Sequence, residues 1–352
     1  MKNRCFGFCC ILCAVCLLAP ILSLAEEGSW GQINQELKRS GDWTRIVTEP
    51  AFALGEGTPY AGDESITVLS YGSYPSLDGS TVCVPLAMEL ARQQLDLPEG
   101  DLNGFVAFST TPNAYERLIR GLPNPMSTLV SRNAVMDDAR PVDLILVTEP
   151  SDEERALAEA EGCELVCVPF CYDAFVFLVN EDNPVTGLTG EQIRDIYTGN
   201  IIDWGDVGGE GGRGIFAYQR PKNSGSQTLM ENLVMDGVRL TAAQPNFISD
   251  GMSDLVEQIG SYDNSDRALG YSFLYYITSL YTSDHIRVLA VNGTEPTEEN
   301  IRSGAYPYTV NYWAVYRKGN ETAERFVSWL ISEEGQVCVR QAGYIPYLPK
   351  AE

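Results

Sequence analysis

VDLILVTEPSDEERALAEAEGCELVCVP, residues 142–169, contains the pattern of a strand, a helix and a second strand in succession. Residues 142–148 are an almost unbroken apolar run, which is typical of a strand buried on both faces of a parallel sheet. Ser151 and Glu154 have the spacing of a capping box at the start of the helix, and Gly162 ends it. The stretch therefore predicts a β-α-β unit, the building block of an α/β protein.

Strand and helix patterns also alternate along the rest of the chain. Further strands are predicted at 66–69, 174–180, 215–219, 286–291 and 308–316, and further helices at 84–95, 115–120, 227–236 and 322–341. Thr189 and Gln192 cap another short helix, which ends at Gly199. Alternation of this kind predicts an α/β fold with mostly parallel sheets.

The N-terminal segment, residues 1–25, has the pattern of an export signal. After a positively charged start, residues 5–22 are apolar, and the segment closes on Ser23 and Ala25, which suit a cleavage site. The apolar length also leaves open a retained membrane anchor, whereas lipidation lacks a convincing motif. We expect an exported protein, extracellular or in the cell envelope, attached to the membrane if this segment is kept. Residues 26–61 are interpreted as an N-terminal extension.

Composition and charge limit the partners of the protein. The chain has 352 residues, of which 44% are hydrophobic and 20% charged, so it is long enough for two lobes with separate cores. Its net charge of −24 argues against nucleic acid or an anionic membrane as a partner. A site for an anion would have to be built locally, from hydrogen-bond donors and helix ends.

Five cysteines follow the N-terminal segment, and their number is odd: Cys83, Cys163, Cys167, Cys171 and Cys338. An odd number in an exported chain means at least one free thiol or an intermolecular bond. Their spacing matches no CxxC-type motif and the chain has a single histidine, so the sequence offers no recognisable metal site. We expect buried thiols and neither a metal nor another cofactor.

Three loops lead from a predicted strand into the start of a helix and carry small hydroxylated residues. They are 78–81 (DGST), 109–112 (STTP) and 220–228 (RPKNSGSQT). In the second loop, Thr111 is predicted to cap the helix, with Pro112 as its first residue. A helix start exposes unpaired amide groups and a positive partial charge, so it attracts anions. One such loop is ordinary, but three in one α/β chain indicate an oxyanion site.

Side chains near these loops suit a tetrahedral oxyanion. Ser224 and Ser226 add hydroxyl donors around Gly225, and Arg220 can donate two parallel hydrogen bonds to two oxygens. Glu149 follows the buried strand, where open α/β sheets bind their ligands. A carboxylate there fits an anion that carries a proton, as monohydrogen phosphate does and sulfate does not. An exposed loop glutamate remains the alternative interpretation.

These loops and several other stretches resemble the phosphate-binding proteins of ABC transporters, in particular their Gram-positive-type members, in the type II periplasmic-binding-protein superfamily. The resemblance extends over residues 66–347, and RPKNSGSQT at 220–228 is its most specific part. The other matching stretches are 74–81 (YPSLDGST), 174–183 (AFVFLVNEDN), 188–204 (LTGEQIRDIYTGNIIDW), 268–271 (ALGY), 297–300 (TEEN), 332–336 (SEEGQ) and 343–344 (GY).

The resemblance implies a two-lobed α/β architecture with two crossing strands, which closes on its ligand like a hinge. Lobe one is then expected at 62–171 and 306–350, and lobe two at 172–305, with the crossings near 170–173 and 304–307.

The resemblance also implies which residues bind the ligand. Thr111 takes the place of the family's second-loop serine, and Glu149 that of its acceptor aspartate. Two departures, Thr-Thr-Pro in place of the usual second-loop glycines and Glu in place of Asp, put selectivity for phosphate over other oxyanions in question. The full set of implied ligand-binding residues is Ser80, Thr81, Thr111, Glu149, Arg220, Ser224, Gly225 and Ser226.

The implied function is that of an exported solute-binding protein. It would bind phosphate or a similar oxyanion for ABC-type uptake, as a monomer with a transporter permease as partner. An extracytoplasmic sensor or adhesin-like module of the same fold, with a different ligand, is the alternative. An enzyme has less support, because G-x-S-x-G, HExxH and Walker A motifs are absent and the lone His285 precedes a strand. Paired carboxylates remain open, but we expect no catalytic residues.

Overall fold

The computed structural model describes residues 74–95, 106–125, 128–131, 134–137, 140–243, 247–249, 251–261 and 265–347. The predicted export signal at 1–25, the extension at 26–61 and the strand at 66–69 lie outside the described residues. By its contacts the chain divides into two units, the first ending at Cys171 and resuming at Asn311, the second running from Tyr172 to Val310. Among the described residues, no helix has the length and apolar character needed to cross a membrane.

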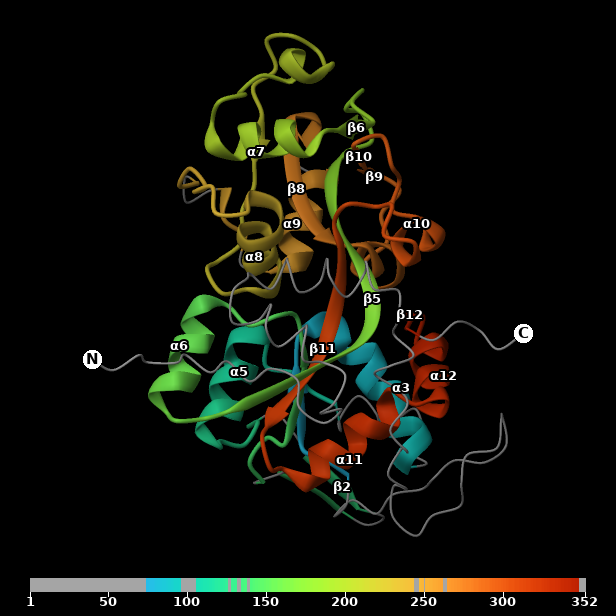
Figure 1. The fold of residues 1–352 in the computed structure, drawn as a ribbon. Coiled ribbons are helices and arrows are strands. Elements are labelled where there is room, and N and C mark those ends of the chain that lie inside the picture. Colours follow the sequence, from blue (N-terminus) through green and yellow to red (C-terminus); the bar gives the residue numbers. More distant parts are fainter. Residues whose placement is uncertain are drawn as a thin grey trace. The chain divides into compact units, whose positions relative to one another are not determined.

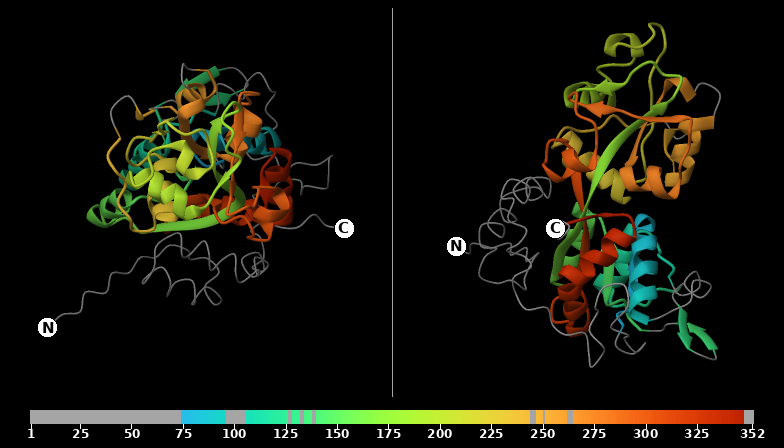
Figure 2. Two further views of the ribbon diagram at one scale, coloured as in Figure 1. Left: turned by 90° about the horizontal axis from the view of Figure 1, so that it is seen from above. Right: turned by 90° about the vertical axis from the view of Figure 1, so that its right-hand side faces the viewer.

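Two strands, β5 (Leu165–Asn180) and β11 (Thr309–Arg317), pass from one unit into the other. They are neighbours in one sheet, whose strand order is β1-β4-β11-β5-β8-β7, and both ribbon views show them side by side (Figures 1 and 2). The predicted fold class, a two-lobed α/β protein with two crossing strands, is confirmed.

The first unit is built around parallel strands β1 (Leu77–Gly79) and β4 (Leu144–Val147), with β11 antiparallel to β4. The α-helices of this unit are α3 (Val84–Leu95), α5 (Thr111–Arg120), α6 (Asp152–Ala160), α11 (Glu321–Leu330) and α12 (Glu333–Gln341). Its shorter elements are η3 (Thr81–Cys83), β2 (Thr128–Ser131), β3 (Ala134–Asp137) and β12 (Ile345–Pro346). Helix α12 packs on α3 and α11, and α5 packs on α6, β1 and β4 (Figure 1).

The core of this unit joins helices to the sheet. Tyr115 and Leu118 of α5 pack with Ile145 and Val147 of β4 and with Trp313 of β11, and all five are buried. Alternate residues of a strand point to the same face, which explains why Ile145 and Val147 share this cluster. The apolar stripe of α5 therefore fixes that helix against the sheet beside the carboxyl end of β4.

Several predicted helix ends in this unit are correct, although α5, predicted at 115–120, already begins at Thr111. Helix α3 has the predicted bounds, and α5 ends at Gly121 with a left-handed backbone. Ser151 and Glu154 form the predicted capping box of α6, a type of contact that contributes about 1 kcal/mol to stability.

The second unit is centred on β8 (Ala268–Phe273), which pairs antiparallel with β5 and parallel with β7 (Phe216–Ala217). Its other strands are β6 (Gly187–Leu188), β9 (Ile286–Val288) and β10 (Ala290–Val291). Its helices are α7 (Gly190–Thr198), η4 (Trp204–Val207), α8 (Gly225–Leu229), the π-helix η5 (Met230–Met235), α9 (Met252–Ser261), η7 (Ser265–Arg267), η8 (Tyr276–Leu280) and α10 (Glu298–Arg302). The capping box of Thr189 and Gln192 begins α7 as predicted.

Aromatic rings fill the core of the second unit. Phe177 of β5 contacts the rings of Tyr197, Tyr271 and Tyr308, with centroids 5.9–6.5 Å apart, and Phe175 lies 5.3 Å from Tyr271. Aromatic pairs in this range add to the stabilisation from burial. The cluster holds β8, and with it the chain on either side of it, against β5.

Four predictions about the elements were wrong. The strand predicted at 286–291 is two short strands, because β9 pairs with β5 whereas β10 pairs with β6. The strands predicted at 164–169 and 174–180 are one strand, β5, because the residues between them are also buried and continue the strand. The helix predicted at 322–341 is interrupted where the Ser332 side chain accepts from the Gly335 amide and starts α12. The sheets are mixed rather than mostly parallel, because β5 runs antiparallel to β8 and β9, and β11 runs antiparallel to β4.

Candidate functional site

Strands β1 and β4 of the first unit end at the same edge of the sheet. Gly79 is paired with Leu146 in the parallel register, and the Ser80 amide donates to the Leu146 carbonyl at 2.9 Å. Because parallel strands bring their carboxyl ends together, the loop after β1 and the loop after β4 share this edge. Three of the predicted binding residues, Ser80, Thr81 and Glu149, lie in these two loops.

The first loop turns directly from β1 into helical backbone. Ser80 has extended backbone angles and precedes η3, which Thr81 begins, but its side chain makes no capping hydrogen bond to η3. Ser80 is 6% exposed. A Cβ at Gly79 would lie 2.9 Å from the Phe108 ring and closer still to the Leu146 carbonyl oxygen. Glycine is therefore required here for the close approach of loop and sheet.

The second loop begins α5 one residue earlier than predicted. Thr110, not Thr111, is the N-cap residue, and Thr111 and Pro112 are the first residues of the helix. Thr110 has φ 81° and ψ 156°, a backbone conformation that residues other than glycine rarely adopt. Sequence spacing cannot reveal it, since Thr-Pro at a helix start fits either register. Thr111 is buried at 4% exposure, with its amide in the first turn of α5.

Glu149 is buried rather than exposed, which removes the alternative interpretation of it as a surface residue. Only 1% of it is accessible, between the end of β4 and the Ser151 cap of α6. The Tyr115 hydroxyl donates to the Thr148 carbonyl at 2.8 Å, which ties this loop to α5. A carboxylate in such a place must interact with hydrogen-bond donors.

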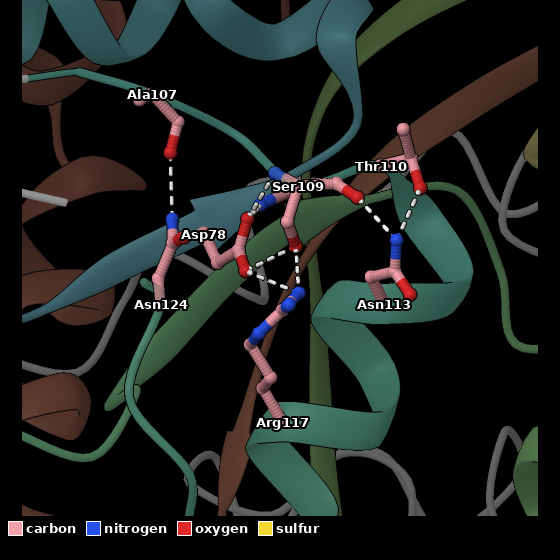
Figure 3. A network of polar contacts seen from close by, with 8 residues as sticks. Asp78, Ala107, Ser109, Thr110, Asn113, Arg117 and Asn124 are labelled. Atoms are coloured by element: carbon pink, nitrogen blue, oxygen red, sulfur yellow. Dashed lines mark hydrogen bonds and ion pairs between the residues drawn. The ribbon is translucent and has the colours of Figure 1, made fainter. Parts of the chain in front are cut away.

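Asp78 is not among the predicted binding residues. It joins the first two loops (Figure 3). It is fully buried. Its Oδ1 accepts from the Gly79 amide at 2.8 Å and the Ser109 amide at 2.7 Å, and its Oδ2 accepts from the Ser109 hydroxyl at 2.5 Å. Arg117 Nη1 lies 3.8 Å from Oδ2 and donates to Ser109 Oγ at 2.5 Å. Burial raises the pKa of the Asp78 carboxyl, and the hydrogen bonds from Ser109 and Gly79 and the charge of Arg117 oppose that rise.

Arg220, in the second unit, is held from both its backbone and its side chain. It is 9% exposed, and its Nε donates to the Ser249 carbonyl at 2.7 Å. Its amide donates to Gln227 Oε1 and to the Tyr271 hydroxyl, each at 3.1 Å. The Ser249 contact fixes the guanidinium plane, so a forked contact with an oxyanion would use the two Nη atoms.

A helix follows the third loop, as predicted, but it begins two residues before its predicted first residue. Ser224 is the N-cap of α8, with its side chain accepting from the Gln227 amide, and Gly225 is the first helical residue. The Ser224 hydroxyl is therefore a cap as well as a candidate ligand group. Ser226 is 1% exposed, and its Oγ has no hydrogen-bond partner in the described part of the chain. Buried hydroxyls normally have such a partner, so the Ser226 hydroxyl is a candidate donor to a ligand.

The predicted residues therefore form two groups. Ser80, Thr81, Thr111 and Glu149 belong to the first unit, and Arg220, Ser224, Gly225 and Ser226 to the second. The described residues contain no cluster of three or more His, Cys, Asp or Glu suited to a metal. The lone histidine, His285, is exposed and its Nδ1 lies 2.6 Å from Glu181 Oε1. Cys338 is buried and Cys163 is half-buried, and neither forms a disulfide.

A family model described as "PBP superfamily domain" matches residues 127–334. Among curated proteins, the phosphate-binding protein PstS of Bacillus subtilis is 30% identical over 171 residues, which cover 48% of this chain and 53% of that protein. PstS of Borreliella burgdorferi is 28% identical over 180 residues, covering 50% and 64%. The chain thus spans between half and two thirds of the length of these relatives. They confirm the resemblance inferred from the sequence.

Solved structures show the same fold. A Clostridium perfringens protein assigned as a phosphate ABC transporter substrate-binding protein, solved with bound phosphate, has a TM-score of 0.56 and 25% identity. That comparison covers 78% of this chain and 99% of the other. An ABC-type phosphate transport receptor from Vibrio cholerae has a TM-score of 0.53 at 20% identity, over 78% and 99% of the chains.

Proposed function

This chain belongs to the PBP superfamily, and on that premise we propose that it is a solute-binding protein that binds phosphate for uptake through an ABC transporter. The observation that carries the proposal is that Arg220 and the start of α8 belong to one loop. The Arg220 guanidinium is buried and donates to Ser249, and the Ser226 hydroxyl in the first turn of α8 has no partner among the described residues. A fixed positive charge and a buried hydroxyl that can donate, both in one loop, suit an oxyanion.

The loops of the first unit are proposed to bind an oxyanion as well. The hydroxyls of Ser80, Thr81 and Thr111 and the amides of the first turns of η3 and α5 are donors suited to that role. This part of the proposal rests on the resemblance to phosphate-binding proteins. The lobe boundaries belong to the same proposal: 62–171 and 306–350 form lobe one, and 172–305 forms lobe two.

Glu149 is the group proposed to select phosphate. At neutral pH monohydrogen phosphate has a hydroxyl that can donate to a carboxylate, and sulfate has none. A buried carboxylate therefore accepts a hydrogen bond from the first anion and repels the second. The side chain of Glu is longer than the aspartate that the resemblance implies for the family, and in this proposal it still serves as the acceptor.

The proposed role includes a partner and a location. The relatives are binding proteins by name, which supports a function without catalysis. A transporter permease is the proposed partner, and the protein is proposed to act as a monomer outside the cytoplasm, with residues 1–25 as its export signal or anchor. The names of the relatives support transport over a separate sensor or adhesin role.

Isothermal titration with phosphate, sulfate and molybdate tests the proposed function. We expect one phosphate per chain, bound about tenfold or more tightly than sulfate, since sulfate cannot donate to Glu149. Binding of none of the three anions would overturn the proposal. Tighter binding of sulfate or molybdate would support an oxyanion site but would contradict phosphate as its ligand.

A further inference from the structure

One carboxylate connects the two hydroxylated loops of the first unit. Asp78 Oδ1 accepts from the amides of Gly79, in the first loop, and Ser109, in the second. Its Oδ2 accepts from the Ser109 hydroxyl. These contacts join positions 31 residues apart in the sequence, inside a region where Asp78 has no exposed surface. The distance between the two loops therefore depends on this side chain.

The same contacts determine what the second loop offers a ligand. Both donors of Ser109, its amide and its hydroxyl, point to Asp78, so Ser109 is not a ligand group. Thr110 comes next with its φ of 81°, and such a conformation persists only where its neighbours impose it. Asn113 Nδ2 also stabilises this turn, since it donates to the Ser109 carbonyl at 2.8 Å and to Thr110 Oγ1 at 3.3 Å (Figure 3).

Charge alone would make Asp78 unfavourable near a bound anion. It is a second acidic residue at the edge where Glu149 also lies, and like charges repel more strongly in a buried environment. Arg117 offsets part of this charge, since its Nη1 is 3.8 Å from Asp78 Oδ2 and donates to Ser109 Oγ. A carboxylate at this place therefore needs a geometric role that outweighs its electrostatic cost to anion binding.

We propose that Asp78 is a positioning residue of the oxyanion site, which ties the first loop to the second and so sets the spacing of Thr81 and Thr111. Arg117 supports it by balancing its charge and by holding the Ser109 hydroxyl. The proposal rests on the proposed function for its ligand, but the joining of the two loops does not depend on that ligand.

The variant Asp78→Asn separates geometry from charge because the two roles predict opposite signs. Asn keeps an acceptor for the backbone amides, but its Nδ2 faces the Ser109 hydroxyl and Arg117, which are donors. The positioning role predicts phosphate binding weaker by about tenfold or more. A purely electrostatic effect predicts tighter binding of phosphate and sulfate, because a nearby negative charge is lost.

Asp143→Asn is the matched control. Asp143 also joins distant segments of the first unit: its Oδ2 accepts from the Ser76 amide at 2.9 Å and its Oδ1 from Asn320 Nδ2 at 2.8 Å. It precedes β4 and so lies at the opposite end of the strands from the site. Its replacement should lower the melting temperature and leave phosphate affinity within about twofold. Equal losses of affinity in both variants would show that general destabilisation, not positioning, weakens binding.

Hydrogen exchange on the ligand-free protein provides the second readout. Asp78→Asn should speed exchange of the Gly79 and Ser109 amides, because repulsion of Nδ2 by the Ser109 hydroxyl and by Arg117 moves the side chain away from them; Asp143→Asn should not. If Asp78→Asn does not fold, Ser109→Ala removes the hydroxyl contact alone and should weaken phosphate binding by a few fold. Unchanged exchange together with unchanged or tighter binding would overturn the proposal. A wild-type protein that binds no phosphate would overturn the proposed function, while exchange would still decide the role of Asp78.

Discussion

Replacing Arg220 by Ala should weaken phosphate binding more than any other single change in the third loop. The side chain is 9% exposed and oriented by the 2.7 Å bond from Nε to the Ser249 carbonyl, so little entropy remains to be lost when it binds an anion. Loss of a buried, charge-assisted contact of this kind costs about 2–4 kcal/mol, or about 30- to 1,000-fold in affinity. Some affinity should survive, because the Ser224 cap and the start of α8 stay in place.

Isothermal titration of Arg220→Ala with phosphate measures this loss, and Arg267→Ala is its matched control. Arg267 is in the same unit, its Nε also donates to a backbone carbonyl, that of Gly214 at 2.9 Å, and its guanidinium lies 4.1 Å from the centre of the Phe216 ring. The control should lose stability but keep its phosphate affinity within about twofold. Unchanged affinity in Arg220→Ala would refute the assignment of an oxyanion to this loop.

Three further predictions concern Glu149, Glu154 and Gly79. Glu149→Gln should weaken phosphate binding and leave sulfate binding level or stronger, as measured by titration; equal weakening of both would show that Glu149 does not sense the proton. Burial raises the pKa of the Glu154 carboxyl from its ordinary 4.5 to about 7, so the wild type loses stability as pH rises from 4.5 through 7. The stability difference between Glu154→Gln and wild type, measured by denaturation, should therefore shift by about 3 kcal/mol in favour of the variant between pH 4.5 and 8, and a pH-independent difference would contradict this. Gly79→Ala should destabilise the protein by about 1–3 kcal/mol through overpacking, whereas Gly211→Ala, where a Cβ meets nothing within 4 Å, should be near neutral in the same melts.

Local signals predicted the helix starts well. The capping boxes at Ser151 and Thr189 formed as expected, because the pairing groups lie three residues apart and need no tertiary context. The unbroken course of β5 was missed, since a fully buried strand gives no alternating pattern to separate a continuous strand from two short ones. The break at Ser332 was missed because the apolar pattern runs through both α11 and α12.

The candidate site was predictable where its residues lie in one loop and less so where they come from distant loops. Arg220 and Ser224 were identified from a single contiguous motif. Asp78 was overlooked because an Asp-Gly pair in a loop is ordinary turn chemistry, and its partner Ser109 lies 31 residues further along the chain. The conformation of Thr110 likewise depends on Asn113 and Asp78 together, and no sequence rule places a threonine there.

The central claim, that the hydroxylated loops of this chain bind phosphate, is tested most directly by hydrogen exchange with and without phosphate. Phosphate should slow exchange of the amides at 80–81 and 111 in the first unit and of those at 224–226 in the second. Exchange that phosphate leaves unchanged at these amides would contradict the claim.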